Sequence, residues 1–595
     1  MSNTTTGATI IATALKAQRV DVIFGIVGIP VVEVAEACTA QGIKFIGFRN
    51  EQSASYAASA YGFLTGRPGV CLTVGGPGVV HGLAGLANAK PVVMLAGSSD
   101  THEQGMGAFQ ELDQVEVCRP FTKYAVRPSS ISQIPFVLEK AFRSSIYGRP
   151  GACYIDLVGV TILTSAGQTF LPLPSYSVIL RNIRCASFSP GDYIQSHISN
   201  ARVAAILASS LPVADPPISL SDPNSIASAV ELLRGASRPL VIVGKGASYS
   251  RAEKEVLQFV ERTNIPFLPT PMGKGLVPDT HPLCVAAARS KAIAEADVVL
   301  LLGARLNWIL HFGSSPRFNN AVKFIQADIH PEESSGRVVP VVSLIGHIPA
   351  VLSQLLTHPD LPTHPPTSVY AQGLHQKVVD NLRKTEQLGT QKRLGMPMTY
   401  QTAFWEIKRQ LPSTGVVYVS EGANTMDIAR TMFDVAEPRC RVDSGTFATM
   451  GVGMGFAIAA QVVYPDKRVV AIVGDSAFGF SAMELETAAR ANFPLIIIVI
   501  NNNGIYHGLD SAEFTKSRKD GTLPSTALSV DTRYDLISEA CGGRGWFVRT
   551  TEELGEAVRQ SLAETSKTCV INVAIVPGGR KKLEFAWQTK TDSKL

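Results

Sequence analysis

Long hydrophobic runs and charge clusters are both missing from this 595-residue sequence. The longest apolar stretches, Pro494–Ile500 and Val298–Leu302, are far shorter than the roughly 20 residues of a membrane-spanning helix. Charged residues make up only 17% of the chain, the formal net charge is +5, and no Lys/Arg cluster typical of nucleic-acid binding occurs. We therefore expect no membrane span and no nucleic-acid partner.

The sequence also lacks cysteine motifs, and we expect no secretory leader. The nine cysteines are scattered without a C-x-x-C pair or a Cys/His metal spacing, so we interpret them as reduced packing residues of an intracellular protein. The first residues, MSNTTTGATIIATAL, lack the basic region and cleavage site of a signal peptide. What the sequence has is 45% hydrophobic residues, over a length that predicts about three to four well-packed domains.

The most informative stretch runs from Val469 to Gly504. It begins with an apolar strand that ends at Gly474-Asp475-Ser476 and closes with a second strand that ends at Asn501-Asn502-Asn503-Gly504. A strand–helix–strand unit predicts parallel strands, so Asp475 and Asn502 should lie at the same edge of the sheet. The apolar spacing between the strands predicts one helix with a buried face made of Ala477, Phe478, Met483, Leu485 and Ala488.

The residue types at this edge suit a divalent cation. If the two strands are neighbours, their ends are about 5 Å apart, within reach of one ion. A carboxylate, an amide oxygen and the backbone carbonyl of Gly504 are hard oxygen ligands, which Mg²⁺ prefers when it bridges to a phosphorylated ligand. The helix start after Ser476 adds N–H groups and a positive dipole end for the phosphates.

A GDS turn with Asn502 27 residues after Asp475, in a run of Asn and Gly, resembles the diphosphate-binding motif of thiamine-diphosphate enzymes. The resemblance implies thiamine diphosphate and Mg²⁺ as cofactors, with Asp475, Asn502 and Gly504 as the metal ligands. A simpler interpretation, an ordinary βαβ unit with polar strand ends, would account for Asp475 alone but not for the whole pattern.

The N-terminal residues extend this resemblance. Glu51 lies between a strand, Lys44–Phe48, and a helix, Ser53–Leu64, where a lone acidic residue is usually a helix cap. However, FGIVGIP and RNEQSASYAASAYGFLTGRPGVCLTVGGPG resemble the pyrimidine-binding domain of the same family. There, a glutamate in the position of Glu51 hydrogen-bonds the aminopyrimidine ring and so promotes removal of the thiazolium C2 proton. The resemblance therefore implies that Glu51 is catalytic.

Residues 100–157 resemble two groups within the family, the peroxisomal 2-hydroxyacyl-CoA lyases and the oxalyl-CoA decarboxylases. The decarboxylases usually carry Tyr-Glu where this chain has Phe109-Gln110, whereas the lyases carry Phe-Gln. This favours a lyase that cleaves 2-hydroxyacyl-CoA into formyl-CoA and an aldehyde one carbon shorter, in fatty acid alpha-oxidation. Three alternatives remain: an oxalyl-CoA decarboxylase that forms formyl-CoA and CO₂, a non-catalytic relative that binds the cofactor, and a carboligase of free 2-keto acids.

The resemblance also implies further contacts. Met450 matches the bulky residue that bends the cofactor, and Ala448 replaces the glycine of most relatives, so we expect a negative φ there. Contacts with the cofactor are implied for Glu51, Ala423, Asn424, Thr425, Ala448, Met450, Asp475, Ser476, Asn502 and Tyr506. Contacts with the acyl-CoA substrate are implied for Ile29, Phe109, Gln110 and Lys274. Contacts with ADP, the nucleotide activator of the decarboxylases, are implied for Arg149, Lys245, Arg305 and Asp328, although basic residues at strand ends are more often structural.

The expected fold is α/β, with three doubly wound parallel-sheet domains. The pyrimidine-binding domain covers residues 1–158, a Rossmann-like central domain 223–355, and the diphosphate-binding domain 398–580. Residues 356–397 form a linker. Residues 159–222 form an atypical insert or linker, in which Gly159–Pro212 is either a surface insertion or an intron read as coding sequence.

Assembly and location follow from the resemblance and from the last residues. In the family, the domain of Glu51 in one subunit faces the domain of Asp475 in another, which implies a homodimer or a homotetramer. The tail, 581–595, ends in Ser593-Lys594-Leu595, a peroxisomal address when it stands at the extreme C-terminus. We therefore expect an enzyme of the peroxisomal matrix that binds the import receptor through this tripeptide.

Overall fold

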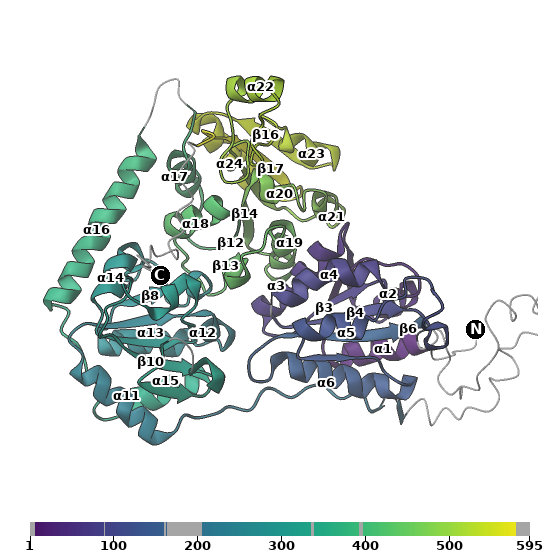
Figure 1. Ribbon diagram of the computed structural model, residues 1–595, viewed down its shortest axis with the longest axis horizontal. Helices are drawn as coiled ribbons and strands as arrows, with labels where there is room; N and C mark the ends of the chain where they lie inside the picture. Colours follow the sequence, from purple (N-terminus) through teal and green to yellow (C-terminus); the bar gives the residue numbers. More distant parts are fainter. Residues whose placement is uncertain are drawn as a thin grey trace, which may run out of the picture. The chain divides into compact units, whose positions relative to one another are not determined.

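The computed structural model describes residues 6–88, 90–159, 162, 205–206, 208–334, 338–391 and 397–578. Most of the predicted insert Gly159–Pro212 and the whole tail with Ser593-Lys594-Leu595 lie outside these residues. The chain divides into two compact units, Met1–Pro216 and Pro217–Leu595. Parallel sheets form the centre of both, one in the first unit and two in the second, which confirms the predicted three-sheet α/β fold (Figure 1).

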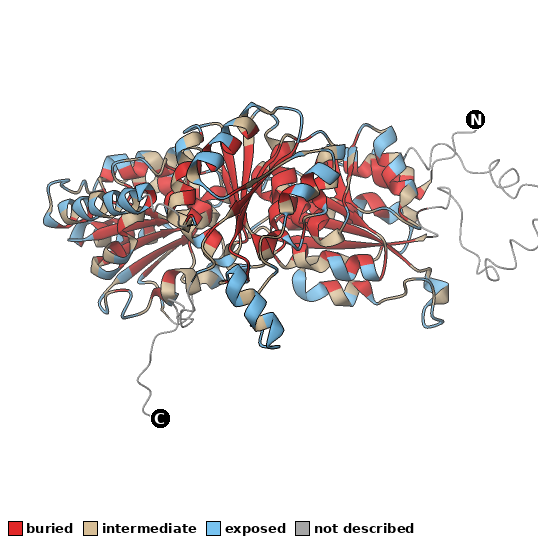
Figure 2. Cartoon of the chain, turned by 90° about the horizontal axis from the view of Figure 1, so that it is seen from above, coloured by how far each residue is buried: buried red, intermediate tan, exposed pale blue. Residues whose placement is uncertain are grey.

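The sheet of the first unit has six strands in the order β2-β1-β3-β4-β6-β5. The strands are β1 (Val22–Gly25), β2 (Lys44–Gly47), β3 (Gly69–Thr73), β4 (Val92–Ser98), β5 (Tyr124–Val126) and β6 (Ala152–Val158). The helices are α1 (Gly7–Ala17), α2 (Val32–Ala40), α3 (Glu51–Thr65), α4 (Pro77–Ala87), α5 (Gln114–Cys118) and α6 (Ile134–Ile146). Strands β3, β4 and β6 are buried along their whole length, as expected for a parallel sheet covered by helices on both faces (Figure 2).

The first sheet of the second unit has five strands in the order β11-β10-β9-β7-β8. They are β7 (Pro239–Val243), β8 (Phe267–Pro269), β9 (Val298–Leu302), β10 (Lys323–Asp328) and β11 (Val342–Ile345). Its helices are α11 (Pro223–Gly235), α12 (Lys245–Tyr249), α13 (Glu253–Thr263), α14 (Arg289–Glu295) and α15 (Ile348–Thr357). Alternate residues of β9 enter two separate cores, Leu300 on one face and Val299 on the other, so this sheet is also covered on both sides.

The second sheet of this unit has six strands in the order β13-β12-β14-β15-β17-β16. They are β12 (Val416–Glu421), β13 (Arg441–Asp443), β14 (Arg468–Gly474), β15 (Ile496–Asn501), β16 (Arg544–Val548) and β17 (Cys569–Ala574). Its helices are α17 (Tyr400–Gln410), α18 (Ala423–Met432), α19 (Gly453–Val463), α20 (Asp475–Phe478), α21 (Glu484–Arg490), α22 (Ser511–Lys519), α23 (Tyr534–Ala540) and α24 (Thr551–Ala563). The long, largely exposed helix α16 (Val369–Thr390) falls within the predicted linker (Figure 2).

The connection between β14 and β15 differs from the prediction. Two short helices, α20 and α21, replace the single expected helix, because the chain turns at Gly479–Met483, where glycine and serine have low helix propensity. The prediction that Met483 is buried is wrong, since 54% of it is exposed. The other members of the predicted face, Ala477, Phe478, Leu485 and Ala488, are buried.

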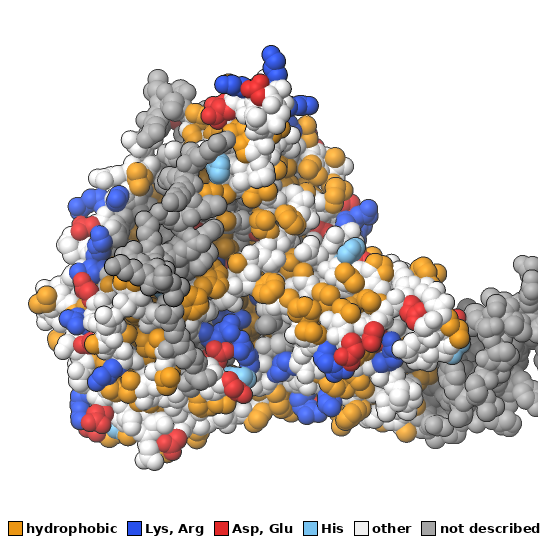
Figure 3. Space-filling model, in the orientation of Figure 1, with side chains coloured by type: hydrophobic (Ala, Val, Ile, Leu, Met, Phe, Trp, Pro, Cys, Tyr) orange, Lys and Arg blue, Asp and Glu red, His pale blue; other side chains and the backbone are white. Residues whose placement is uncertain are grey.

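From the composition we expected reduced, packed cysteines and no membrane span. The eight cysteines of the described residues are free thiols, and seven of them are buried. No helix in the described part of the chain is both long and apolar enough to cross a bilayer. On the face drawn in Figure 3, acidic and basic side chains are interspersed, in keeping with the small net charge.

Candidate cofactor site

The predicted cation ligands follow two neighbouring strands of the third sheet along the chain, the one formed by β12 to β17. β14 pairs with β15 in parallel, with Gly474 opposite Ile500, and β12 lies on the other side of β14, with Glu421 opposite Val473. The carboxyl ends of all three strands therefore meet at one edge of the sheet, which confirms the adjacency on which the predicted site depends.

The carboxylate of Asp475 joins the two strand ends. It is 2% exposed, and its oxygens accept hydrogen bonds from the N–H of Ser476 (2.8 Å) and of Gly504 (3.1 Å). Burial raises the pKa of Asp475 to about 6, against the opposing effect of these and neighbouring backbone N–H groups. A cation bound here would offset the cost of ionising a buried carboxyl.

The carbonyl oxygen of Tyr506 gathers two more of the predicted residues. The amide Nδ2 groups of Asn424 and Asn502 both donate to it, at 3.0 and 3.2 Å. Because the Asn502 N–H₂ group is used in this way, its amide oxygen is the atom that can ligate a cation. The structure thus brings Asn424, Asn502, Gly504, Tyr506 and Asp475 into one cluster.

A narrow backbone cradle completes this edge. Gly422 has φ +90°, and a Cβ built on it would lie only 3.2 Å from the Gly474 nitrogen and 3.6 Å from Cβ of Thr425. Helix α18 begins directly after Gly422 without a side-chain cap, so the N–H groups of its first residues, Ala423, Asn424 and Thr425, are the kind of donors that bind an anion at a helix start. These donors beside a carboxylate fit a phosphorylated group held through a divalent cation.

The composition of the ligand set also bears on which metal fits. Within the described ranges, no three His, Cys, Asp or Glu side chains gather as metal ligands. The predicted ligands, Asp475, Asn502 and Gly504, offer one carboxylate, one amide oxygen and one carbonyl oxygen. Oxygen ligands of this kind suit Mg²⁺, whereas zinc sites usually contain sulfur or imidazole ligands.

Glu421, at the end of β12, is a buried acid that the sequence analysis did not select. It is 1% exposed and accepts hydrogen bonds from the N–H groups of Gly451, Val452 (3.1 Å) and Gly453 (2.7 Å), where α19 begins. Burial raises the pKa of Glu421 to about 7, although the three N–H groups oppose this. Glu421 therefore ties the turn that carries Met450 to the end of the strand. The sequence signal that could have revealed Glu421 is its position, since it is an acidic residue directly at the end of an apolar strand.

The expected backbone conformation of Ala448 is wrong. Its φ is +55° and its ψ +35°, in the left-handed region that costs an alanine about 1–2 kcal/mol. The turn is fixed on both sides, since the Gly445 N–H donates to Asp443 (2.9 Å) and the Gly451 N–H to Glu421. The chain reverses between these two anchors, and the left-handed residue falls at Ala448.

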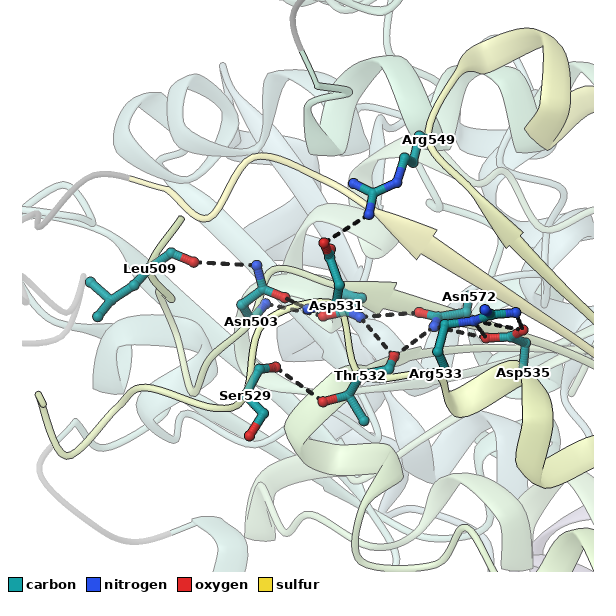
Figure 4. Close-up of polar contacts among 10 residues, drawn as sticks. Asn503, Leu509, Ser529, Asp531, Thr532, Arg533, Asp535, Arg549 and Asn572 are labelled. Carbon is teal, nitrogen blue, oxygen red and sulfur yellow. Dashed lines mark hydrogen bonds and ion pairs between the residues drawn. The ribbon is translucent and has the colours of Figure 1, made fainter. Parts of the chain in front are cut away.

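A polar network braces the loop that holds Asn502 and Gly504 (Figure 4). Asn503 accepts from the Asp531 N–H (2.9 Å) and donates to the Leu509 carbonyl (3.2 Å). Asn501 accepts from the Asn503 N–H, at 3.1 Å. Farther out, the network continues through Thr532, Arg533, Asp535, Arg549 and Asn572. The asparagines on either side of Asn502 are therefore structural supports that sequence reasoning missed.

In the first unit, Glu51 is the first residue of α3 but is not its cap. Asn50 caps the helix, because its side chain accepts from the Gln52 N–H at 2.8 Å. The Glu51 carboxyl is instead turned to His81 on α4, whose Nδ1 lies 3.1 Å from Oε2. Sequence reasoning missed His81, because nothing in a lone histidine of a helix reveals a partner 30 residues earlier.

The predicted substrate residues of this unit lie on two loops. Ile29 and Phe109 are 75% and 72% exposed. Gln110 has φ +57° and packs its backbone on Gly76, where a Cβ would lie 2.9 Å from the Gln110 carbonyl oxygen. The buried Gln114, which the sequence analysis did not select, holds this arrangement by accepting from the Gly76 N–H at 2.5 Å.

The remaining predicted contacts separate into different places. Lys274 is 8% exposed and forms an ion pair with the buried Asp279 at 2.7 Å. Lys245 follows β7, Arg305 follows β9, and Asp328 is the last residue of β10. These three strands are neighbours in the five-stranded sheet, so the three residues share one edge of it. Arg149 belongs to the first unit, just before β6.

Three parts of the chain match known sequence families. Residues 5–117 match one described as "Thiamine pyrophosphate enzyme, N-terminal TPP binding domain". Residues 226–355 match "Thiamine pyrophosphate enzyme, central domain", and residues 421–573 match "Thiamine pyrophosphate enzyme, C-terminal TPP binding domain". The three matches follow the order of the three sheets.

Curated relatives are similar over nearly the whole chain. The chain is 48% identical to "2-hydroxyacyl-CoA lyase 1" of Mus musculus, over 98% of this chain and 97% of that protein. It is 41% identical to "2-hydroxyacyl-CoA lyase" of Saccharomyces cerevisiae, over 99% of each. It is also 40% identical to "Oxalyl-CoA decarboxylase" of Escherichia coli, over 96% of this chain and 95% of that protein.

Proposed function

Since this chain belongs to the thiamine pyrophosphate enzyme family, we propose that it is a carbon–carbon lyase acting on 2-hydroxyacyl-CoA. The products would be formyl-CoA and an aldehyde one carbon shorter, as in fatty acid alpha-oxidation. The observation that carries this substrate is the pair Phe109-Gln110, where Phe109 offers an exposed ring. The 48% identity to a protein named as a lyase, against 40% to one named as a decarboxylase, supports it.

Thiamine diphosphate and Mg²⁺ are the proposed cofactors. When bound, thiamine diphosphate supplies a carbon nucleophile and an electron sink for breaking the bond beside the thioester carbonyl. Asp475, the amide oxygen of Asn502 and the carbonyl oxygen of Gly504 would hold Mg²⁺. The start of α18, with Asn424 and Thr425, would bind the diphosphate. The buried carboxylate, the left-handed glycine cradle at Gly422 and the Tyr506 cluster support this proposal.

The chain's own residues would divide the remaining work. Glu51 would hold and transfer a proton at the aminopyrimidine ring, and Met450 would set the bend of the cofactor. Phe109 would cover the acyl chain, with a gain of about 25 cal/mol for each Å² of apolar surface buried. Gln110 would offer amide hydrogen bonds in place of a carboxyl, so it adds no charge next to an uncharged acyl tail.

The test is the ratio of kcat/KM for a long-chain 2-hydroxyacyl-CoA and for oxalyl-CoA, measured on one preparation. We expect the lyase substrate to be preferred, and Phe109→Tyr to lower lyase kcat/KM on long chains, because a hydroxyl would be buried against the acyl tail. Phe136→Tyr is the matched control, since Phe136 is a 61% exposed phenylalanine of α6 in the same unit. A preference of the unmodified enzyme for oxalyl-CoA would favour the alternative, a decarboxylase.

Location and regulation belong to the same proposal. The tripeptide Ser593-Lys594-Leu595 supports import into the peroxisome, and deleting Leu595 should leave the purified enzyme active but its fluorescent fusion cytosolic.

Lys245, Arg305 and Asp328, at one sheet edge, support an ADP site, which isothermal titration of ADP would test. A homodimer or homotetramer is proposed from the family and would be measured by light scattering.

A further inference from the structure

His81 stands beside the proposed catalytic carboxyl, and the sequence gives it no role. Its Nδ1 lies 3.1 Å from Oε2 of Glu51. The Glu51 side chain is 13% exposed, whereas the imidazole is 56% exposed. The pair therefore links a largely enclosed carboxyl to the open surface of the unit.

The geometry of the two helices fixes this contact. A Cβ built on Gly85 of α4 would lie 2.4 Å from Oγ of Ser55 on α3. The backbone of α4 therefore packs directly against the Ser55 side chain of α3. Glu51 and Ser55 are four residues apart on α3, and His81 and Gly85 are four residues apart on α4, so each pair lies on one helix face. The close approach at Gly85 and Ser55 thus sets the distance between His81 and Glu51.

Hydrogen-bond chemistry determines how the ring is protonated in this contact. An ionised carboxylate only accepts hydrogen bonds, so Nδ1 of His81 must carry the hydrogen. The neutral ring then has its lone pair at Nε2, on the other end of the imidazole. Histidine is suited to pass a proton from one ring nitrogen to the other, because each can bind and release one near neutral pH.

We propose that His81 positions Glu51 and relays protons between it and the surrounding solution. In the forward direction, Nε2 accepts a proton from a water or buffer acid, and the Nδ1–H bond breaks as its proton moves to Oε2 of Glu51. The ring ends neutral, as the Nε2–H tautomer, and Glu51 ends as the carboxylic acid. The return step reverses both transfers, so protons and charge balance.

Other titratable groups on the elements that pack against α4 have different partners. The charge of Glu51 also acts on the buried Cys71 of β3, whose pKa it raises in addition to the larger effect of burial. The others interact as follows: Tyr56 with Gln52, Tyr61 with Asp21 and Arg67, Cys153 with Lys123, Tyr154 with Asp156 and Gln114, and Arg119 with Glu116. The carboxyl of Glu51 is thus the charged group that lies within hydrogen-bond distance of the His81 ring.

The first measurement uses the cofactor-free protein. Histidine-selective ¹⁵N NMR reports which ring nitrogen carries the hydrogen, and the spectrum of His81→Gln identifies the His81 signals. We expect the neutral ring to be the Nδ1–H tautomer in the unmodified protein and to change to Nε2–H in Glu51→Ala. An Nε2–H tautomer in the unmodified protein would overturn the proposal.

The second measurement is the hydrogen–deuterium exchange rate at C2 of thiamine diphosphate bound to the enzyme, without substrate. We expect the rate to fall about tenfold in both His81→Phe and His81→Gln, with cofactor affinity unchanged. Added imidazole should restore His81→Phe with a saturable dependence on concentration. His102→Gln is the matched control, since His102 is a 45% exposed histidine that also lies near a carboxylate, Glu103.

The variants separate the two parts of the proposal. A glutamine at position 81 can hold Glu51 by a hydrogen bond but cannot relay a proton, so full exchange in His81→Gln would overturn the relay. Unchanged exchange in His81→Phe would overturn both parts. The proposal rests on the proposed cofactor but not on the proposed substrate, because neither measurement uses an acyl-CoA.

Discussion

The first and third sheets have the same strand order, yet the predicted functional residues follow different strands in each. Counted along the chain within each sheet, both have the order 2-1-3-4-6-5. In the first sheet, Glu51 follows the edge strand β2. In the third sheet, Asp475 and Asn502 follow the central strands β14 and β15. One topology would therefore serve two kinds of proposed site, which differ in the side chains at the strand ends.

The two sites also differ in how they support a carboxyl group. Asp475 and Glu421 are almost completely buried and accept hydrogen bonds from backbone N–H groups of a loop or a helix start. Glu51 is paired with a half-exposed imidazole instead. Backbone donors hold a charge in place but exchange no protons, whereas an imidazole does both. The difference is what we expect if one sheet carries the proposed cation anchor and the other the proposed proton-transferring acid.

The largest expected effect comes from removing the carboxyl group that we propose transfers a proton, that of Glu51. Glu51→Gln keeps the size and a hydrogen-bonding amide but cannot hold or release a proton, so C2 exchange and turnover should fall about 10²- to 10⁴-fold. Binding of Mg²⁺ and thiamine diphosphate, measured by titration calorimetry, should stay close to normal. Near-normal C2 exchange in Glu51→Gln would show that Glu51 does not transfer the proton. The proposed functional difference between the first and third sheets would then be wrong.

The next effect concerns the cation anchor. Asp475→Ala should weaken Mg²⁺-dependent cofactor binding about 10³-fold, because it removes the charged partner of a buried cation. Excess Mg²⁺ and cofactor should restore part of the activity. Asp466→Ala is the control, since Asp466 is an exposed acid just before the same strand. Cofactor affinity that is unchanged at low Mg²⁺ would contradict the assignment of Asp475.

A smaller effect should appear in stability against pH, measured without Mg²⁺. The folded-state pKa of Glu421, about 7, lies above its ordinary value of 4.5. The folded protein therefore binds the proton more tightly, and this stabilisation is lost as pH rises towards 7. Glu421 alone should lower the free energy of unfolding by about 2 kcal/mol between pH 5 and 7.

The control for this prediction is Glu421→Gln, whose side chain cannot ionise. Its free energy of unfolding should therefore fall by about 2 kcal/mol less than that of the unmodified protein between pH 5 and 7. Asp475, with a pKa of about 6, contributes in the same direction and should remain in the variant. An equal slope in the variant and the unmodified protein would show that Glu421 is ionised throughout this range.

The smallest effect tests the strained turn. Ala448→Gly should raise the free energy of unfolding by about 0.5–1 kcal/mol, because glycine adopts φ +55° without the steric cost but loses more chain entropy on folding. Denaturant titration would measure it. Ala448→Val should be destabilising, since a β-branched residue is more strained there. A less stable glycine variant would mean that the turn relaxes when the side chain is removed.

The sequence predicted the sheets and the adjacency of the strands that end at Asp475 and Asn502, because both follow from local patterns. Apolar runs ending in Gly-Asp-Ser and in Asn-Asn-Asn-Gly specify strand ends, and a crossover helix makes the strands parallel. The partners of those residues were missed. His81 is 30 positions from Glu51, and the Gly451 N–H is 30 positions from Glu421. Such pairs depend on how helices and loops pack, which no local pattern records.

The errors within the predicted site have a similar origin. Met483 has the spacing of a buried helix residue, but the chain leaves the helix at Gly479 before reaching it. Ala448 was expected at negative φ because alanine prefers it, and the anchors at Asp443 and Glu421 override that preference. In both cases the surrounding structure outweighs the intrinsic tendency of one residue.

The exposure of Ile29 and Phe109 has a consequence for engineering the enzyme. Both side chains contribute little to the core, so a library that varies them should retain most of its folded members. Gly76 and Gly85, in contrast, have no room for a side chain and should be kept constant in such a library. If Ile29 and Phe109 contact the acyl chain as proposed, acyl-chain preference could be changed at these two positions with little loss of folded protein.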